Sequence, residues 1–78
     1  MVTCGIDIGS STIEIVLLDG TGIAERSIAA AGISPAAAAK GMFERMLAAR
    51  GLFRSDLARV VATGFGRNYC TAADAAIS

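Results

Sequence analysis

The sequence predicts an α/β fold in which an antiparallel meander of three strands is followed by a crossover helix and a fourth, parallel strand. Three observations support this prediction. The first thirty residues contain apolar runs, rich in β-branched side chains, that are separated by short segments of Gly, Ser and Thr. A helical repeat of apolar residues comes next, and another β-branched run follows it. A strand reached through a helical crossover lies parallel to an earlier strand, with a right-handed connection.

The meander is expected to comprise residues 2–8, 13–19 and 23–30. Isoleucine and valine are frequent in these runs, and branching at Cβ favours extended backbone. The first turn is expected at residues 9–12, with the sequence Gly-Ser-Ser-Thr. The second is expected at residues 19–22, Asp-Gly-Thr-Gly, because glycine adopts positive φ without steric cost.

The helix is expected over residues 35–50. Ser34 can cap its first turn, and Pro35 suits the first helical position, where a missing N–H is harmless. Gly51 suits the position just after the helix. One face carries apolar residues at helical spacing: Ala39, Met42, Phe43, Met46 and Leu47. We expect this face to pack on the sheet.

The remaining residues are expected to form a turn at 55–56, the fourth strand over 57–63, a loop over 64–67 and the start of a second helix. The strand is indicated by the apolar run Val-Val-Ala at 60–62. The second helix is indicated by Thr71 as a candidate N-cap and by alanine at four of the five positions that follow.

Composition excludes several classes of function. Seven basic and seven acidic residues give a net charge of zero, which does not suit a nucleic-acid-binding surface. The longest apolar run, residues 15–18, is far shorter than the roughly 20 residues that span a membrane. The N-terminus does not resemble a signal peptide, so a cytoplasmic location is expected. The hydrophobic fraction of 54% is high for 78 residues and predicts apolar surface that a partner covers.

Two cysteines and no histidine leave no spacing typical of a metal site. Cys4 and Cys70 are expected to be buried free thiols, because the cytoplasm keeps thiols reduced. A disulfide between them is the alternative that the sequence leaves open.

The strongest chemical signal is the segment 5–12, Gly-Ile-Asp-Ile-Gly-Ser-Ser-Thr. A turn of Gly, Ser and Thr gathers N–H groups and hydroxyls that can bind anionic oxygens. Gly9 allows the backbone to approach a phosphate closely. Asp7, at the end of a strand, could hold Mg²⁺ through water or orient an attacking water, as phosphoryl transfer requires. The alternative is an ordinary hairpin in which these polar groups only satisfy the turn.

The pattern Asp-x-Gly-Ser-x-Thr between two strands resembles the first phosphate motif of the superfamily of acetate and sugar kinases, heat-shock chaperones and actin, whose fold is ribonuclease H-like. It is not a Walker loop, because no Gly-Lys-Ser/Thr follows. Together with residues 62–68, Ala-Thr-Gly-Phe-Gly-Arg-Asn, it resembles the activator ATPases of 2-hydroxyacyl-CoA dehydratases and the ATPase subunits of benzoyl-CoA reductase (the BadF/BadG/BcrA/BcrD type).

This resemblance implies an actin-like ATPase that binds ATP and Mg²⁺, with residues 1–78 as a single, incomplete N-terminal subdomain that is not catalytic alone. It implies Asp7 as the catalytic and magnesium-holding residue. The residues implied to bind nucleotide are Gly9, Ser10, Ser11, Thr12, Thr63, Gly64, Gly66 and Arg67. The relatives often carry a further hydroxyl residue and a lysine after the turn, where this chain has Ile13 and Glu14, so no positive charge is expected from this hairpin.

The family further implies a homodimer that shares one [4Fe–4S] cluster and couples ATP hydrolysis to electron delivery to an acyl-CoA dehydratase or reductase. Neither Cys4 nor Cys70 corresponds to a cluster ligand. One alternative is part of a sugar or acetate-type kinase, in which the loop after the fourth strand would contact the phosphoryl acceptor. Another is a free-standing small fold without catalysis. The loop sequence Thr-Gly-Phe-Gly-Arg-Asn favours the activator.

Overall fold

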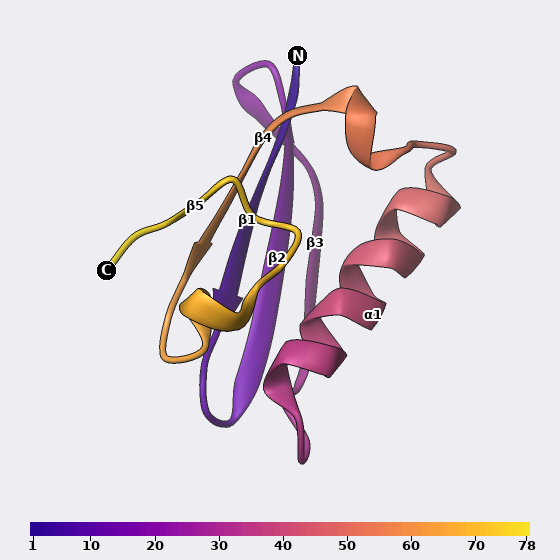
Figure 1. The fold of residues 1–78 in the computed structure, drawn as a ribbon. Coiled ribbons are helices and arrows are strands. Elements are labelled where there is room, and N and C mark those ends of the chain that lie inside the picture. Colours follow the sequence, from indigo (N-terminus) through magenta and orange to yellow (C-terminus); the bar gives the residue numbers. More distant parts are fainter.

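The computed structural model describes residues 1–78 and contains one mixed sheet of five strands (Figure 1). The strands are β1 (Val2–Ile8), β2 (Thr12–Asp19), β3 (Gly22–Ala30), β4 (Leu57–Thr63) and β5 (Ala75–Ala76). Their order across the sheet is β3-β2-β1-β4-β5. The first three strands pair antiparallel, whereas β4 pairs parallel with β1, and β5 parallel with β4. The predicted meander and parallel crossover strand are therefore confirmed.

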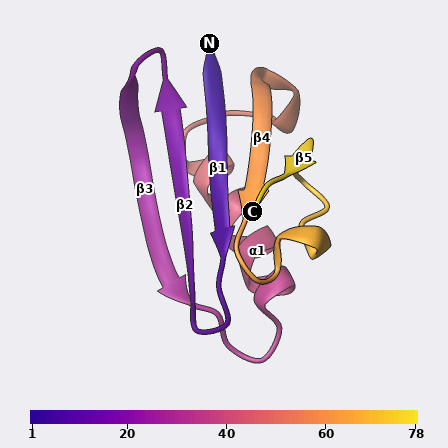
Figure 2. The same cartoon turned by 90° about the vertical axis from the view of Figure 1, so that its left-hand side faces the viewer.

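Helix α1 (Pro35–Ala49) connects β3 to β4 and lies on one face of the sheet (Figures 1 and 2). Ser34 caps it, because its Oγ accepts a hydrogen bond from the Ala37 N–H at 3.4 Å. Gly51 follows the helix with a φ of 68°, a conformation that glycine adopts most easily. The predicted helix thus ends one residue early, at Ala49. It is too short to cross a membrane, and no helix in the structure has the length and hydropathy that a crossing requires.

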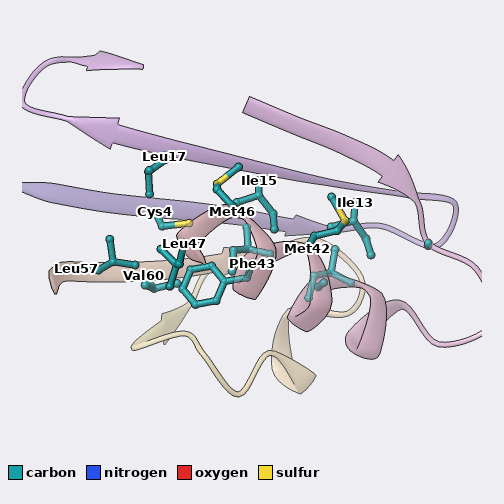
Figure 3. Close-up of a cluster of buried hydrophobic side chains, with 14 residues drawn as sticks. Cys4, Ile13, Ile15, Leu17, Met42, Phe43, Met46, Leu47, Leu57 and Val60 are labelled. Carbon is teal, nitrogen blue, oxygen red and sulfur yellow. The ribbon is translucent and has the colours of Figure 1, made fainter. Parts of the chain in front are cut away.

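The core lies between α1 and the sheet (Figure 3). All five residues of the predicted apolar helix face are buried there. The sheet contributes alternate side chains from β1, β2 and β4, since successive residues of a strand point to opposite faces. The largest fully buried ones are Ile6, Ile8, Ile13, Ile15, Leu17 and Val60. Burial of an aliphatic side chain of this size stabilises the fold by about 1.5–3 kcal/mol.

The prediction of a second helix after Thr71 is wrong. Residues 64–74 form an irregular connection with a 3₁₀ turn at Arg67–Tyr69, and the chain then enters β5. The Asp74 N–H donates to the Val60 carbonyl at 2.8 Å, and the Ile77 N–H donates to the Ala62 carbonyl at 2.9 Å. These bonds to β4 take the place of the backbone hydrogen bonds that a helix would make.

The face of the sheet opposite α1 is covered by no helix (Figures 1 and 2). It carries the other half of the alternation, including the charged residues Asp7 and Glu14 and the half-buried Val16 and Val61. We refer to it as the open face. The predicted site residue Asp7 lies on it, near the end of β1.

Candidate functional site

The turn at residues 9–12 joins β1 to β2 and presents donors that have no acceptor within the chain. The Gly9 N–H donates to the Thr12 carbonyl at 3.0 Å, which closes the turn. The N–H groups of Ser10 and Ser11 donate no hydrogen bond, and both residues are exposed. The hydroxyls of Ser10, Ser11 and Thr12 make no hydrogen bond either. The turn therefore offers several donors to an external anion.

Gly9 does not have a positive φ, so backbone conformation does not require glycine at this position. The reason for glycine is the space around it. A Cβ added to Gly9 would lie 3.0 Å from the Thr12 carbonyl oxygen, which is tighter than ordinary contact. A side chain here would press on the turn itself. The turn is also tied to the end of β3, since the Ala31 N–H donates to the Ser11 carbonyl at 2.8 Å.

Asp7 carries a free carboxylate one residue before the end of β1. It is exposed and makes no hydrogen bond or ion pair. Across the open face it pairs with Glu14 on β2 and with Thr63 on β4. Glu14 is bound by the Arg26 Nε at 2.8 Å, which offsets the repulsion between two neighbouring carboxylates. A cavity of about 260 Å³ on this face is lined in part by Asp7, Glu14 and Thr63.

The loop that follows β4 packs directly against the end of β1 (Figure 2). The Gly66 N–H donates to the Ile8 carbonyl at 2.8 Å. A Cβ on Gly64 would lie 2.6 Å from the Ile8 carbonyl oxygen and would also collide with the Asp7 carboxylate. A Cβ on Gly66 would lie 2.6 Å from the Ile8 Cγ2. Both glycines are therefore needed for a close approach between this loop and the strand that carries Asp7.

Arg67 folds back on its own loop. One guanidinium nitrogen donates to the Gly64 carbonyl at 3.0 Å, and the side chain is half-buried. A guanidinium carries five N–H groups, so most of them remain without a partner in the chain. The structure thus brings every predicted site residue to one edge of the sheet, where β1 and β4 end.

Sequence reasoning missed two features of this edge. The first is the packing of Gly64 and Gly66 against Ile8. The second is the Glu14–Arg26 ion pair beside Asp7. The Gly-x-Gly spacing indicates that the loop 64–67 lies close to another part of the chain. No local pattern in the sequence shows that this part is β1.

The expectation of two buried thiols is confirmed for Cys4, whereas Cys70 is only half-buried. Both are free, and no group of three or more potential metal ligands occurs in the structure. Burial, together with the nearby Cys70, raises the pKa of Cys4 to about 11, which disfavours the thiolate that would bind a metal. A [4Fe–4S] cluster takes four cysteine thiolates, so the residues present do not fit one.

Comparison with known proteins gives a result only for solved structures, since no family model and no curated protein matches the chain. Component A of the (R)-2-hydroxyglutaryl-CoA dehydratase of Acidaminococcus fermentans is 32% identical over the whole chain, with a TM-score of 0.83. The activator of the 2-hydroxyisocaproyl-CoA dehydratase of Clostridium difficile, with bound ADPNP, is 33% identical over the whole chain, with a TM-score of 0.81. The chain spans 30% and 29% of the lengths of these two proteins.

A protein described as a 2-dehydro-3-deoxygalactonokinase from Sinorhizobium meliloti is 18% identical over 81% of the chain and 21% of its own length. Its TM-score of 0.60 shows a shared fold. The predicted actin-like subdomain is confirmed by the two more similar structures. The resemblance to the activators of 2-hydroxyacyl-CoA dehydratases is thus confirmed, since about one third of the residues are identical over the whole of this chain.

Proposed function

We propose that this chain forms the phosphate-binding side of an ATP site in an activator that hydrolyses ATP. The observation that carries the proposal is the turn at 9–12, where the N–H groups of Ser10 and Ser11 have no acceptor, beside the free carboxylate of Asp7. Exposed donors beside an acidic side chain suit a triphosphate and its divalent cation. The nucleotide analogue bound to the similar Clostridium difficile protein supports the proposal.

Each part of this edge would have its own task. Ser10, Ser11 and Thr12 would donate hydrogen bonds to phosphate oxygens, with Gly9 leaving room for the close approach. Asp7 would hold Mg²⁺ through water and orient the attacking water. Bound Mg²⁺ neutralises charge that develops on the phosphates during transfer. Thr63 and Arg67 would add a hydroxyl and a guanidinium, while Gly64 and Gly66 keep their loop against β1.

The activator is favoured over a sugar or acetate-type kinase by sequence identity. The two activator-type structures match all of the chain at 32% and 33%, whereas the kinase matches 81% of it at 18%.

We propose further that the chain is one subdomain of a larger cytoplasmic ATPase, since it spans about 30% of its solved relatives. The rest of such a protein would supply the other side of the nucleotide site. Its resemblance to the family supports the proposal of a homodimeric assembly and of electron delivery to an acyl-CoA dehydratase or reductase component. The [4Fe–4S] cluster of that assembly would need ligands from outside these 78 residues.

Titration of the chain with Mg·ADPNP, followed through its amide resonances, tests the proposal. Roughly four hydrogen bonds at about 1 kcal/mol each correspond to a Kd on the order of 1 mM. The largest shifts are expected at residues 9–12. Gly9→Val should abolish them, and Ser11→Ala should weaken affinity by about two- to tenfold.

Gly5→Ala is the matched control, because no atom lies within 4 Å of a Cβ added there. It should leave the affinity unchanged. Equal effects of Gly9→Val and Gly5→Ala, or shifts centred away from residues 9–12, would show that the turn does not bind phosphate.

A further inference from the structure

The connection between β4 and β5 carries the loop 64–67, yet it has little regular structure of its own. Its Cys70, Ala72 and Ala73 pack against the core, and apart from short-range turn bonds its polar contacts with the rest of the chain lie at two places. One is the bond between Gly66 and Ile8, beside the candidate phosphate site. The other is a cluster of bonds around Arg54 and Asp74 at its far end. The position of the loop therefore depends on both attachments.

The far attachment is a network of four polar contacts. The Asp74 carboxylate accepts from the Val60 N–H at 2.7 Å and from the Arg54 guanidinium at 3.0 Å. The Asp74 N–H donates to the Val60 carbonyl at 2.8 Å. The Arg54 Nε donates to the Ala72 carbonyl at 3.1 Å. One arginine thus holds both the end of the connection and the carboxylate that fixes it to β4.

Charge strengthens this network. The Val60 N–H, followed by Arg54, holds the pKa of Asp74 below its usual range, although partial desolvation opposes the shift. The carboxylate therefore stays ionised, and hydrogen bonds to ionised groups are the stronger ones. The local sequence favours a helix here. Instead, the bonds of Asp74 to Val60 hold the chain beside β4, and β5 begins at the next residue.

We propose that Arg54 and Asp74 form a clamp that positions the loop 64–67 against the end of β1 and thereby fixes Asp7. They are positioning residues, because neither touches the turn at 9–12. Release of the clamp would leave the far end of the connection held only by its backbone bonds to β4 and by the packing of Cys70, Ala72 and Ala73 on the core. The loop 64–67 would then move away from β1 more often. The contact between Gly64 and the Asp7 carboxylate would no longer be fixed. The link to nucleotide rests on the proposed function, but the clamp itself does not.

Hydrogen exchange of the Gly66 amide, measured on the 78-residue chain, tests the clamp directly. Asp74→Ala and Arg54→Met should each speed this exchange about tenfold, the factor that matches loss of one charge-assisted hydrogen bond. Amides in the β1–β2 pair should change less. Asp74→Asn keeps an acceptor for the Val60 N–H and should restore part of the protection. Arg54→Met keeps the proposal testable if Asp74→Ala fails to fold.

Glu25→Ala is the control, because it breaks an equally exposed ion pair, that between Arg50 and Glu25, far along the chain from the loop. It should leave the exchange of Gly66 unchanged. An unchanged Gly66 in both clamp variants, or a rise no larger than in β1–β2, would overturn the proposal. If Gly66 responds while no form of the chain binds Mg·ADPNP, the clamp stands and the proposed function fails.

Discussion

Gly64→Ala is expected to destabilise the chain by roughly 2–5 kcal/mol. Gly64 has a φ of 91°, where a residue with a Cβ costs about 1–2 kcal/mol. The added Cβ would also lie 2.6 Å from the Ile8 carbonyl oxygen and against the Asp7 carboxylate. Overpacking of this kind typically costs about 1–3 kcal/mol. The two contributions together give the expected range.

Gly20→Ala separates these two contributions. Gly20 also has a positive φ, 65°, but no atom lies within 4 Å of a Cβ added there. It should lose only the backbone contribution of about 1–2 kcal/mol. Urea unfolding of both variants, followed by circular dichroism, gives the two free energies. If Gly64→Ala loses no more than Gly20→Ala, the loop does not pack on β1 as described.

Three further outcomes follow from the structure. The pKa of Asp74 is lower in the folded chain than in the unfolded chain, where it is about 3.9. Asp74 therefore stabilises the fold above a pH of about 3.9, and this stabilisation is lost as the pH falls through its folded-state pKa. Asp74→Asn should therefore flatten the acid limb of urea midpoints measured against pH, and an unaltered limb would contradict this. In a Cys70→Ser background at pH 8, Cys4 should react with iodoacetamide far more slowly in the folded chain than in urea, because burial, the largest cause of its raised pKa, does not depend on Cys70; equal rates would contradict the burial. Ile15→Ala should cost about 2–5 kcal/mol in urea unfolding, and the exposed Ile28→Ala far less, since only the first opens a cavity; equal losses would refute the assigned core.

Strands and helix could be predicted because their signals are local. Alternation of apolar residues marks the strands, and the spacing of Ala39, Met42 and Phe43 marks the buried face of α1. Ser34 and Gly51 mark its ends. The second helix was wrongly predicted because alanine content is also a local signal. The carboxylate of Asp74 finds its partners, Val60 and Arg54, only once β4 has been placed beside it.

The sequence predicted the residues of the candidate site and their expected roles, but not how the loop after β4 packs beside them. The turn at 9–12 could be recognised because Gly, Ser and Thr are the residues that a backbone cradle needs. The structure gives Gly64 and Gly66 a packing role that the sequence could not reveal, since it depends on Ile8 lying beside them. Arg67 likewise contacts its own loop through Gly64.

The central claim is that phosphate and its cation bind at the end of β1. Mn²⁺ can replace Mg²⁺ in the complex with ADPNP, and its paramagnetism broadens nearby amide signals. The strongest broadening is predicted at residues 7–12 and 63–66, with little at Gly20, which lies a whole strand length away, roughly 20 Å. Mn²⁺ without nucleotide should broaden these signals far less, and Asp7→Asn should weaken the effect. Broadening strongest elsewhere, or equal with and without ADPNP, would contradict the account.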